Sequence, residues 1–386
     1  MSDNRFILQK PEAMLFFNAL TDLGYDRNLG VSVPLLGGIT LFKAHPAGRT
    51  VTIADFIDQR AYRQATDALT RRMRDHGRRE VPDYGALRQL FYAAGILTPS
   101  GLERLEEILA DLRSRDVTRG GDVYFLAPDT NLIRDRFYSV WLSRRPPHQN
   151  LDFLLCDTVR DELRNRRDKF KKNDLKGLKP LSMGLLEECF LNQNCLEDRM
   201  RYVGFLEYNR MRAATSCEEI DAPSSKRSGL ENDRFIQAAY SGFVGVGRKV
   251  VFLSRDNEAV QAMSGEDNVI PVLLEHPPFY MNDFAARWGR FLDFLYLLGV
   301  LFGRIDLSVG GMKTASLYGV WRGKDAEEWE TDRLRLDLVR PAGGDREEQR
   351  EFAFVSDRME KNLAVLRKLK GASEPPASES IPRLNP

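Results

Sequence analysis

The middle of the chain alternates short apolar runs with longer segments of helical spacing. The runs are rich in Val, Leu and Phe, and each is short enough to be a strand buried on both faces. Helical patterns follow at residues 130–142, after residue 157 and after residue 256. This alternation predicts an α/β domain with a parallel sheet over residues 121–280. Its predicted strands are residues 123–127, 151–156, 249–254 and 269–274.

The pattern changes on both sides of this segment. Residues 1–120 contain several stretches of helical spacing, so we expect a separate, mainly helical N-terminal module. Residues 281–345 begin with a strongly apolar helical stretch and continue with alternating apolar and polar positions, which predicts a helix plus a small β meander. For residues 346–386 we expect a further helix and a polar, disordered tail.

Composition narrows the class of protein. A length of 386 residues predicts two or three domains, and a net charge of +1 excludes a broadly basic coat for nucleic acid. The four cysteines include no Cys-x-x-Cys pair, which disfavours a zinc ribbon and fits a reducing compartment. The first residues lack the apolar segment of a signal peptide, and the apolar stretch 291–302 is too short to cross a bilayer. We therefore expect a cytoplasmic protein without membrane contact.

Four acidic residues occupy similar positions in the predicted strand–helix units. Asp129 and Asp256 follow predicted strands within two residues, whereas Glu162 and Asp233 lie near the starts of predicted helices. Right-handed crossovers bring the carboxyl ends of parallel strands, and the starts of the helices that follow them, to one edge of the sheet. The sequence therefore predicts that these four carboxylates meet in space.

Carboxylates that converge repel each other unless cations neutralise them. Mg²⁺ and Mn²⁺ prefer oxygen ligands of this kind, and two such ions roughly 3.5–4 Å apart can stabilise both oxygens of a phosphoryl displacement. We therefore expect a site for Mg²⁺ or Mn²⁺ that hydrolyses phosphodiester bonds. The hydroxyl and amide side chains expected to support the ligands are Thr130, Asn131, Asn232 and Ser254.

Each acid taken alone has a simpler interpretation. Asp129, Asp233 and Asp256 fit helix N-termini, and Glu162 has Arg166 four residues later on the same helical face. All four arriving in order favours the metal site over four separate structural roles. The ligand at two of the positions stays open, because Asp161 precedes Glu162 and Glu231 lies two residues before Asp233.

Four segments together resemble the PIN-domain nucleases, and the first, third and fourth each look like an acidic motif of that family. They read Phe-Leu-Ala-Pro-Asp-Thr-Asn at 125–131, Asp-Thr-Val-Arg-Asp-Glu-Leu at 157–163, Asn-Asp-Arg-Phe-Ile-Gln-Ala-Ala at 232–239 and Val-Val-Phe-Leu-Ser-Arg-Asp at 250–256. The resemblance covers about residues 122–275. It implies a PIN-like parallel-sheet sandwich and metal-dependent cleavage, mostly of RNA. It also implies an insertion at about 174–228, because the second and third motifs are farther apart than in the small toxin-type members. The residues it places in the metal site are Asp129, Glu162, Asp233 and Asp256.

A run of basic residues surrounds Glu162 and continues beyond it. Two interpretations stay open: a solvated helix face, or a track that holds a phosphate backbone next to the acids. The candidate nucleic-acid contacts in this run are Arg160, Arg164, Arg166, Arg167, Lys169, Lys171 and Lys172.

These observations predict a metal-dependent endoribonuclease with a two-metal carboxylate mechanism. The alternative is a catalytically degenerate PIN-like module that binds nucleic acid or assembles with other proteins. The expected partner is nucleic acid, namely single-stranded or structured RNA, although nothing in the sequence separates RNA from DNA. A regulatory protein partner for the N-terminal module and a homodimer both stay open.

Overall fold

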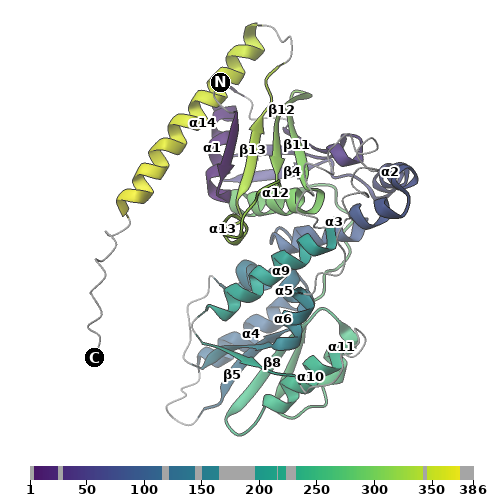
Figure 1. Ribbon diagram of the computed structural model, residues 1–386. Coiled ribbons are helices and arrows are strands. Elements are labelled where there is room, and N and C mark those ends of the chain that lie inside the picture. Colours follow the sequence, from purple (N-terminus) through teal and green to yellow (C-terminus); the bar gives the residue numbers. More distant parts are fainter. Residues whose placement is uncertain are drawn as a thin grey trace, which may run out of the picture.

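Two β-sheets organise the chain, and Figure 1 shows them in two halves of the molecule. The computed structural model describes residues 4–24, 29–114, 121–143, 150–164, 196–214, 216–222, 232–341 and 346–373. At residues 72–80, 197, 232–233 and 370–373 only the backbone is described. Within these ranges, no helix combines the length and the apolar character needed to cross a bilayer.

The larger sheet is antiparallel and has eight strands. It joins both ends of the chain, because strands from the first 54 residues pair with strands from beyond residue 280. Its strands, in spatial order, are β1 (Arg5–Leu8), β13 (Leu334–Leu338), β12 (Met312–Tyr318), β11 (Arg304–Val309), β2 (Leu29–Val33), β3 (Ile39–Ala47), β4 (Thr50–Ala54) and β10 (Phe284–Arg287).

This sheet corrects the expectation of a separate, mainly helical module over residues 1–120. The first half of that segment supplies four strands to a sheet completed by the β meander of residues 304–338, so these two parts form one domain. Within this segment, Val51 and Ile53 alternate inward along β4. The sequence could not reveal the sheet as a whole because β1, β2 and β4 also pair with strands from beyond residue 280, far away along the chain.

A single apolar helix, α12 (Trp288–Phe302), forms the centre of this domain. Nearly all of its side chains are buried, and they pack against the antiparallel sheet and neighbouring helices. It approaches the end of β12 backbone to backbone: a Cβ atom on Gly319 would lie 2.3 Å from the carbonyl carbon of Gly299. The buried guanidinium of Arg199 donates to the carbonyl oxygens of Val300 (3.0 Å) and Leu301 (3.1 Å), which satisfies the end of the helix.

The other helices of this domain cover the sheet and its edges. Helix α14 runs along the outside of the domain beside α1 (Figure 1). The elements are η1 (Lys10–Ala13), α1 (Met14–Asp22), η2 (Pro34–Leu36), α2 (Gln59–Glu80), α3 (Tyr84–Ala93), α13 (Ala326–Glu330) and α14 (Arg346–Ser373).

The second sheet has five strands, all parallel, so the predicted α/β fold with a parallel sheet is confirmed. Numbered along the chain, its strands follow the spatial order 3-2-1-4-5, which places a topological switch point between the first and the fourth. The strands, in spatial order, are β7 (Cys217–Ile220), β6 (Leu151–Cys156), β5 (Val123–Pro128), β8 (Arg248–Ser254) and β9 (Val269–Leu273).

Both faces of the parallel sheet are buried, which explains its continuous apolar runs. Tyr124 and Leu126 of β5 face one core, whereas Phe125 and Ala127 face the other. Helix α4 (Leu102–Arg113) covers the first face. The second face is covered by α6 (Asp157–Arg164), α10 (Asn232–Phe243) and α11 (Asn257–Met263).

Helix α9 (Leu196–Arg212) connects the two domains. Its residues Val203 and Leu206 belong to the core of the antiparallel domain, whereas Tyr208 and Met211 belong to the core beside the parallel sheet. The helix lies within the predicted insertion at about 174–228, so the described part of that insertion joins the domains.

Candidate functional site

The site begins at the switch point, where β5 and β8 end side by side. Asp129 follows β5, and its N–H donates to the carbonyl oxygen of Leu253 at 2.9 Å. Ser254 ends β8, and its hydroxyl donates to Asp129 Oδ2 at 2.5 Å. The same hydroxyl oxygen accepts from the N–H of Asp256 at 2.9 Å. Ser254 therefore holds the two strand ends, and the first and last predicted acids, in one connected group.

Glu162 reaches the same edge from α6. It accepts a hydrogen bond of 2.5 Å from the hydroxyl of Thr130, the first residue of the short helix α5 (Thr130–Arg134). Since Asp129 is the residue before Thr130, the structure brings Glu162 next to the Asp129 position. Thr130 and Ser254, both predicted to support the acids, thus hydrogen-bond to them directly.

The remaining predicted acid cannot be placed in the same way. Asp233 and Asn232 open α10, but their side chains lie outside the described part of the structure, and so does Glu231. Within the described ranges, no three His, Cys, Asp or Glu side chains lie close enough together to share a metal ion. Ser254 thus links the carboxylate of Asp129 to the backbone N–H of Asp256, and Thr130 holds the carboxylate of Glu162 beside the residue that follows Asp129.

Burial sets the electrostatics of Asp129. Its side chain is almost wholly enclosed, and loss of hydration raises its pKa to about 6. Hydrogen bonds from Ser254 and from the N–H of Leu132, together with the charge of Arg255, act in the opposite direction. The neighbouring carboxyl of Asp135 raises the pKa further. A carboxylate in this position is best stabilised by a proton or by a cation.

Both strand-end acids also cap helices, as their simpler interpretations predict. Asp129 Oδ1 accepts from the N–H of Leu132 at 2.8 Å, at the start of α5. Asp256 is exposed, and its Oδ1 accepts from the N–H of Glu258 at 2.8 Å, at the start of α11. Each carboxylate retains further lone pairs, because a carboxylate oxygen can accept more than one hydrogen bond.

The described part of the basic run is only partly free to bind phosphate. Arg160 pairs with Glu219 of β7 and lies 3.7 Å from Asp161, so these two carboxylates neutralise the charge of its guanidinium. Arg164 is exposed at the end of α6. The other five predicted contacts lie outside the described residues: Arg166, Arg167, Lys169, Lys171 and Lys172.

A second polar cluster, not predicted from the sequence, adjoins the site. Arg255, between Ser254 and Asp256 in the chain, places its Nε 3.1 Å from Asp135 Oδ2. Its Nη1 lies 3.2 Å from Nδ1 of His276, whose ring stacks on Tyr92 with centroids 4.1 Å apart. Asp135 Oδ1 accepts from Gln89 of α3 at 2.5 Å. This cluster therefore ties the carboxyl edge of the parallel sheet to a helix of the other domain.

Burial shifts the two titrating groups of this cluster in opposite directions. It raises the pKa of Asp135 to about 6, and together with the charge of Arg255 it lowers the pKa of His276 to about 3. His276 is therefore neutral at physiological pH. Because a guanidinium can only donate, Nδ1 accepts from Arg255 and the ring proton is on Nε2, facing Asp135 Oδ2 at 3.8 Å.

These shifts predict opposite changes in the pH dependence of stability for two variants. Between about pH 4 and about pH 6, unfolding adds a proton to His276 and removes one from Asp135, so their contributions to the slope of stability against pH have opposite signs. His276→Gln should make the slope of unfolding free energy more negative by about 1.4 kcal/mol per pH unit, and Asp135→Asn should make it more positive by a similar amount. Urea unfolding at a series of pH values measures both slopes, and shifts of the same sign would contradict this electrostatic assignment.

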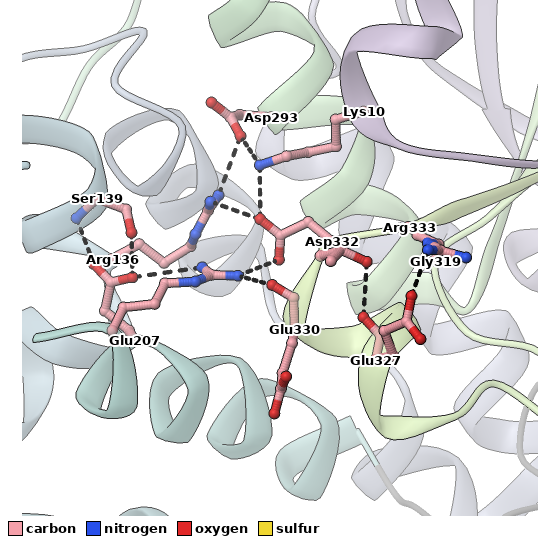
Figure 2. Close-up of polar contacts among 12 residues, drawn as sticks. Lys10, Arg136, Ser139, Glu207, Asp293, Gly319, Glu327, Glu330, Asp332 and Arg333 are labelled. Carbon is pink, nitrogen blue, oxygen red and sulfur yellow. Dashed lines mark hydrogen bonds and ion pairs between the residues drawn. The ribbon is translucent and has the colours of Figure 1, made fainter. Parts of the chain in front are cut away.

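A buried charge network holds the far end of α5 (Figure 2). Arg136, whose side chain is 3 % exposed, places Nη2 3.2 Å from Asp332 Oδ2 and Nη1 3.5 Å from Asp293 Oδ1. Lys10 contacts the same two carboxylates, at 2.7 Å and 2.5 Å respectively. Arg210 of α9 donates to Asp332 Oδ1 at 3.0 Å. Asp332, in the antiparallel domain, therefore binds cations contributed by both halves of the molecule.

The network holds two residues in a backbone conformation that side chains disfavour. Arg136 has φ of 58° and its partner Asp332 has φ of 51°, both in the left-handed region. Such conformations typically cost about 1–3 kcal/mol each and persist where surrounding contacts impose them. The ion pair between them thus fixes the end of the five-residue helix whose other end carries Asp129.

Comparison with known proteins identifies no relative: no protein-family model, curated protein or solved structure matches the chain. The assignment of a function therefore depends on the residues of the site.

Proposed function

We propose that the chain is a metal-dependent nuclease whose parallel-sheet domain is PIN-like. The observation that carries the proposal is the position of Asp129 and Asp256. They follow two adjacent parallel strands at the switch point, where open α/β sheets bind their ligands, and Ser254 links them. Glu162 reaches this edge through its hydrogen bond with Thr130.

The donor set suits Mg²⁺ or Mn²⁺. The described side chains at this edge offer carboxylate and hydroxyl oxygens, which are the ligands these hard ions prefer. The raised pKa of Asp129 is consistent with a position that a cation would stabilise. In this proposal Asp129, Glu162 and Asp256 hold the metal, together with Asp233 at the start of α10.

The chemistry proposed is hydrolysis of a phosphodiester bond, most simply in RNA. When bound, a divalent ion supplies a nucleophilic water at neutral pH and stabilises the charge that develops on the phosphate oxygens. The protein's own residues orient the carboxylates: Ser254 hydrogen-bonds to Asp129, and Thr130 hydrogen-bonds to Glu162.

A catalytically degenerate PIN-like module is the second candidate. One observation favours it: both oxygens of Asp129 already accept hydrogen bonds, and Asp256 uses its carboxylate to cap α11. Such a module would keep the fold and bind nucleic acid, or assemble with a protein partner or a second copy, without cleaving.

Incubating the full chain with labelled single-stranded RNA or DNA distinguishes the two candidates. The nuclease proposal expects cleavage with Mg²⁺ or Mn²⁺ and none with EDTA. Binding without cleavage, under every divalent ion tested, would support the degenerate module.

A further inference from the structure

A cleft between the two domains adjoins the proposed metal site. It consists of two neighbouring cavities of about 380 and 450 Å³, within the usual size range of small-molecule sites. The cavities share Ala86 and Gln89 of α3 on one side and Arg255 on the other. The cleft therefore lies both at a domain interface and beside the switch point, two places where ligands commonly bind.

The inner cavity combines apolar walls with side-chain amides. Leu90, Met200 and Leu297 contribute apolar surface, and Asn131 and Gln89 contribute amides. The charged side chains that line this cavity are Asp83, Arg134, Asp135 and Arg255. Asn131 is in the first turn of α5, two residues after Asp129. Apolar walls with a few amides are suited to the flat face and the hydrogen-bonding edge of a nucleobase.

The outer cavity is lined by cationic and aromatic side chains. Arg88 and Arg255 line it with the stacked pair Tyr92 and His276. The Nε atoms of both arginines are buried and, within the described part of the protein, have no hydrogen-bond acceptor. The Nε atom of Arg255 lies 3.1 Å from Asp135 but not in hydrogen-bond geometry. The guanidinium groups of Arg88 and Arg255 therefore each retain N–H donors for an anion. Two acids also line the cleft: Asp83, which caps α3, and Asp135, which pairs with Arg255.

We propose that this interdomain cleft binds one nucleotide of a single-stranded substrate, with its base in the inner cavity and its phosphate at Arg88 and Arg255. The proposal rests on the proposed nuclease function, since it places the bound nucleotide beside Asp129 and Asp256. It also defines the substrate class: a base can enter the inner cavity only if it is unpaired and unstacked, so a continuous duplex is excluded.

The first variant that tests this proposal fills the cleft with a larger side chain and removes no charged group. Ala86 lines both cavities from α3, so the ring of Ala86→Phe occupies the space of the base. Binding of fluorescein-labelled single-stranded RNA, measured by anisotropy in EDTA, should weaken by about tenfold or more, as expected for loss of one base contact. The matched control is Ala110→Phe on the exposed face of α4, which should change affinity by less than about twofold.

A second variant tests the phosphate contact independently of cavity filling. Arg88→Gln should lower the slope of log affinity against log salt concentration by about 0.7, the value for one phosphate contact on a single strand. Unchanged affinity in Ala86→Phe with an unchanged salt slope in Arg88→Gln would overturn the proposal. Two other results would also overturn the proposal. One is that duplex RNA binds as tightly as the single strand. The other is that free AMP displaces the strand at an AMP concentration equal to the strand's own dissociation constant.

Because these binding measurements need no cleavage, the cleft proposal and the nuclease proposal can fail independently of each other. Single-strand binding that depends on Ala86 and Arg88, but without metal-dependent cleavage, would support the cleft and contradict the nuclease. Cleavage that is unaffected by Ala86→Phe would support the nuclease and contradict the cleft.

Discussion

Replacing Asp129 by Asn is expected to reduce Mn²⁺- or Mg²⁺-dependent cleavage of single-stranded RNA by at least about a hundredfold, because even residues that only orient metal ligands contribute about 10- to 100-fold. Asn has the shape of Asp and caps helices equally well, so α5 should still begin at residue 130. The substitution also removes a buried carboxylate, so the thermal midpoint should not fall. Initial cleavage rates and thermal unfolding of the same preparation measure both effects.

Asp122→Asn is the matched control for this variant. Asp122 precedes β5 at the opposite edge of the same sheet, where it pairs with Lys249 of β8 at 2.8 Å. A carboxylate lost from that edge should leave the cleavage rate unchanged. If Asp129→Asn cleaves as fast as Asp122→Asn, Asp129 is not a ligand in the reaction.

Replacing Asp332 by Asn is expected to cause the largest loss of stability, roughly 3–5 kcal/mol of unfolding free energy at neutral pH, as for other broken buried ion pairs. Asp332 faces three cations, Lys10, Arg136 and Arg210, and the substitution leaves them with fewer counter-charges in a buried environment. Urea unfolding followed by tryptophan fluorescence measures the change.

The pH dependence of this loss has a definite sign. The neighbouring cations hold the pKa of Asp332 well below its usual value of 3.8. The stabilisation is therefore fully present above about pH 4 and disappears as the pH falls below it, because only then does the unfolded chain take up the proton. The difference between parent and variant should accordingly shrink in acid.

The control for Asp332 is Asp357→Asn, which removes an exposed ion pair. Asp357 pairs with Lys361 one turn later on α14 at 2.8 Å, and both side chains are more than half exposed. Exposed pairs of this kind contribute about 0.3–0.5 kcal/mol. Comparable losses in the two variants would mean that the buried network does not stabilise the domain junction.

The parallel sheet was predictable because its signals are local. Strands β5 and β8 are buried on both faces, so they appear as continuous apolar runs, and the acids that follow them lie where a parallel sheet collects its functional groups. The hydrogen bonds of Thr130 and Ser254 to the acids also had a local signal, since Thr130 follows Asp129 directly and Ser254 lies two residues before Asp256.

The antiparallel sheet and the interdomain contacts had no local signal. Strand β1 pairs with β13, about 330 residues away, and neither sequence indicates its partner. The contact of Asp135 with Gln89, and the ion pair of Arg136 with Asp332, likewise join elements that only tertiary packing brings together. Arg255 was not predicted either, although its place between Ser254 and Asp256 is a local signal that could have identified it.

Anomalous diffraction from crystals soaked in Mn²⁺ tests the central claim most directly. We expect manganese density at the carboxyl edge between β5 and β8, at about 2.0–2.2 Å from carboxylate oxygens of Asp129 and Asp256, with Glu162 beside it. Manganese bound only elsewhere, or no density at this edge at a saturating concentration, would contradict it.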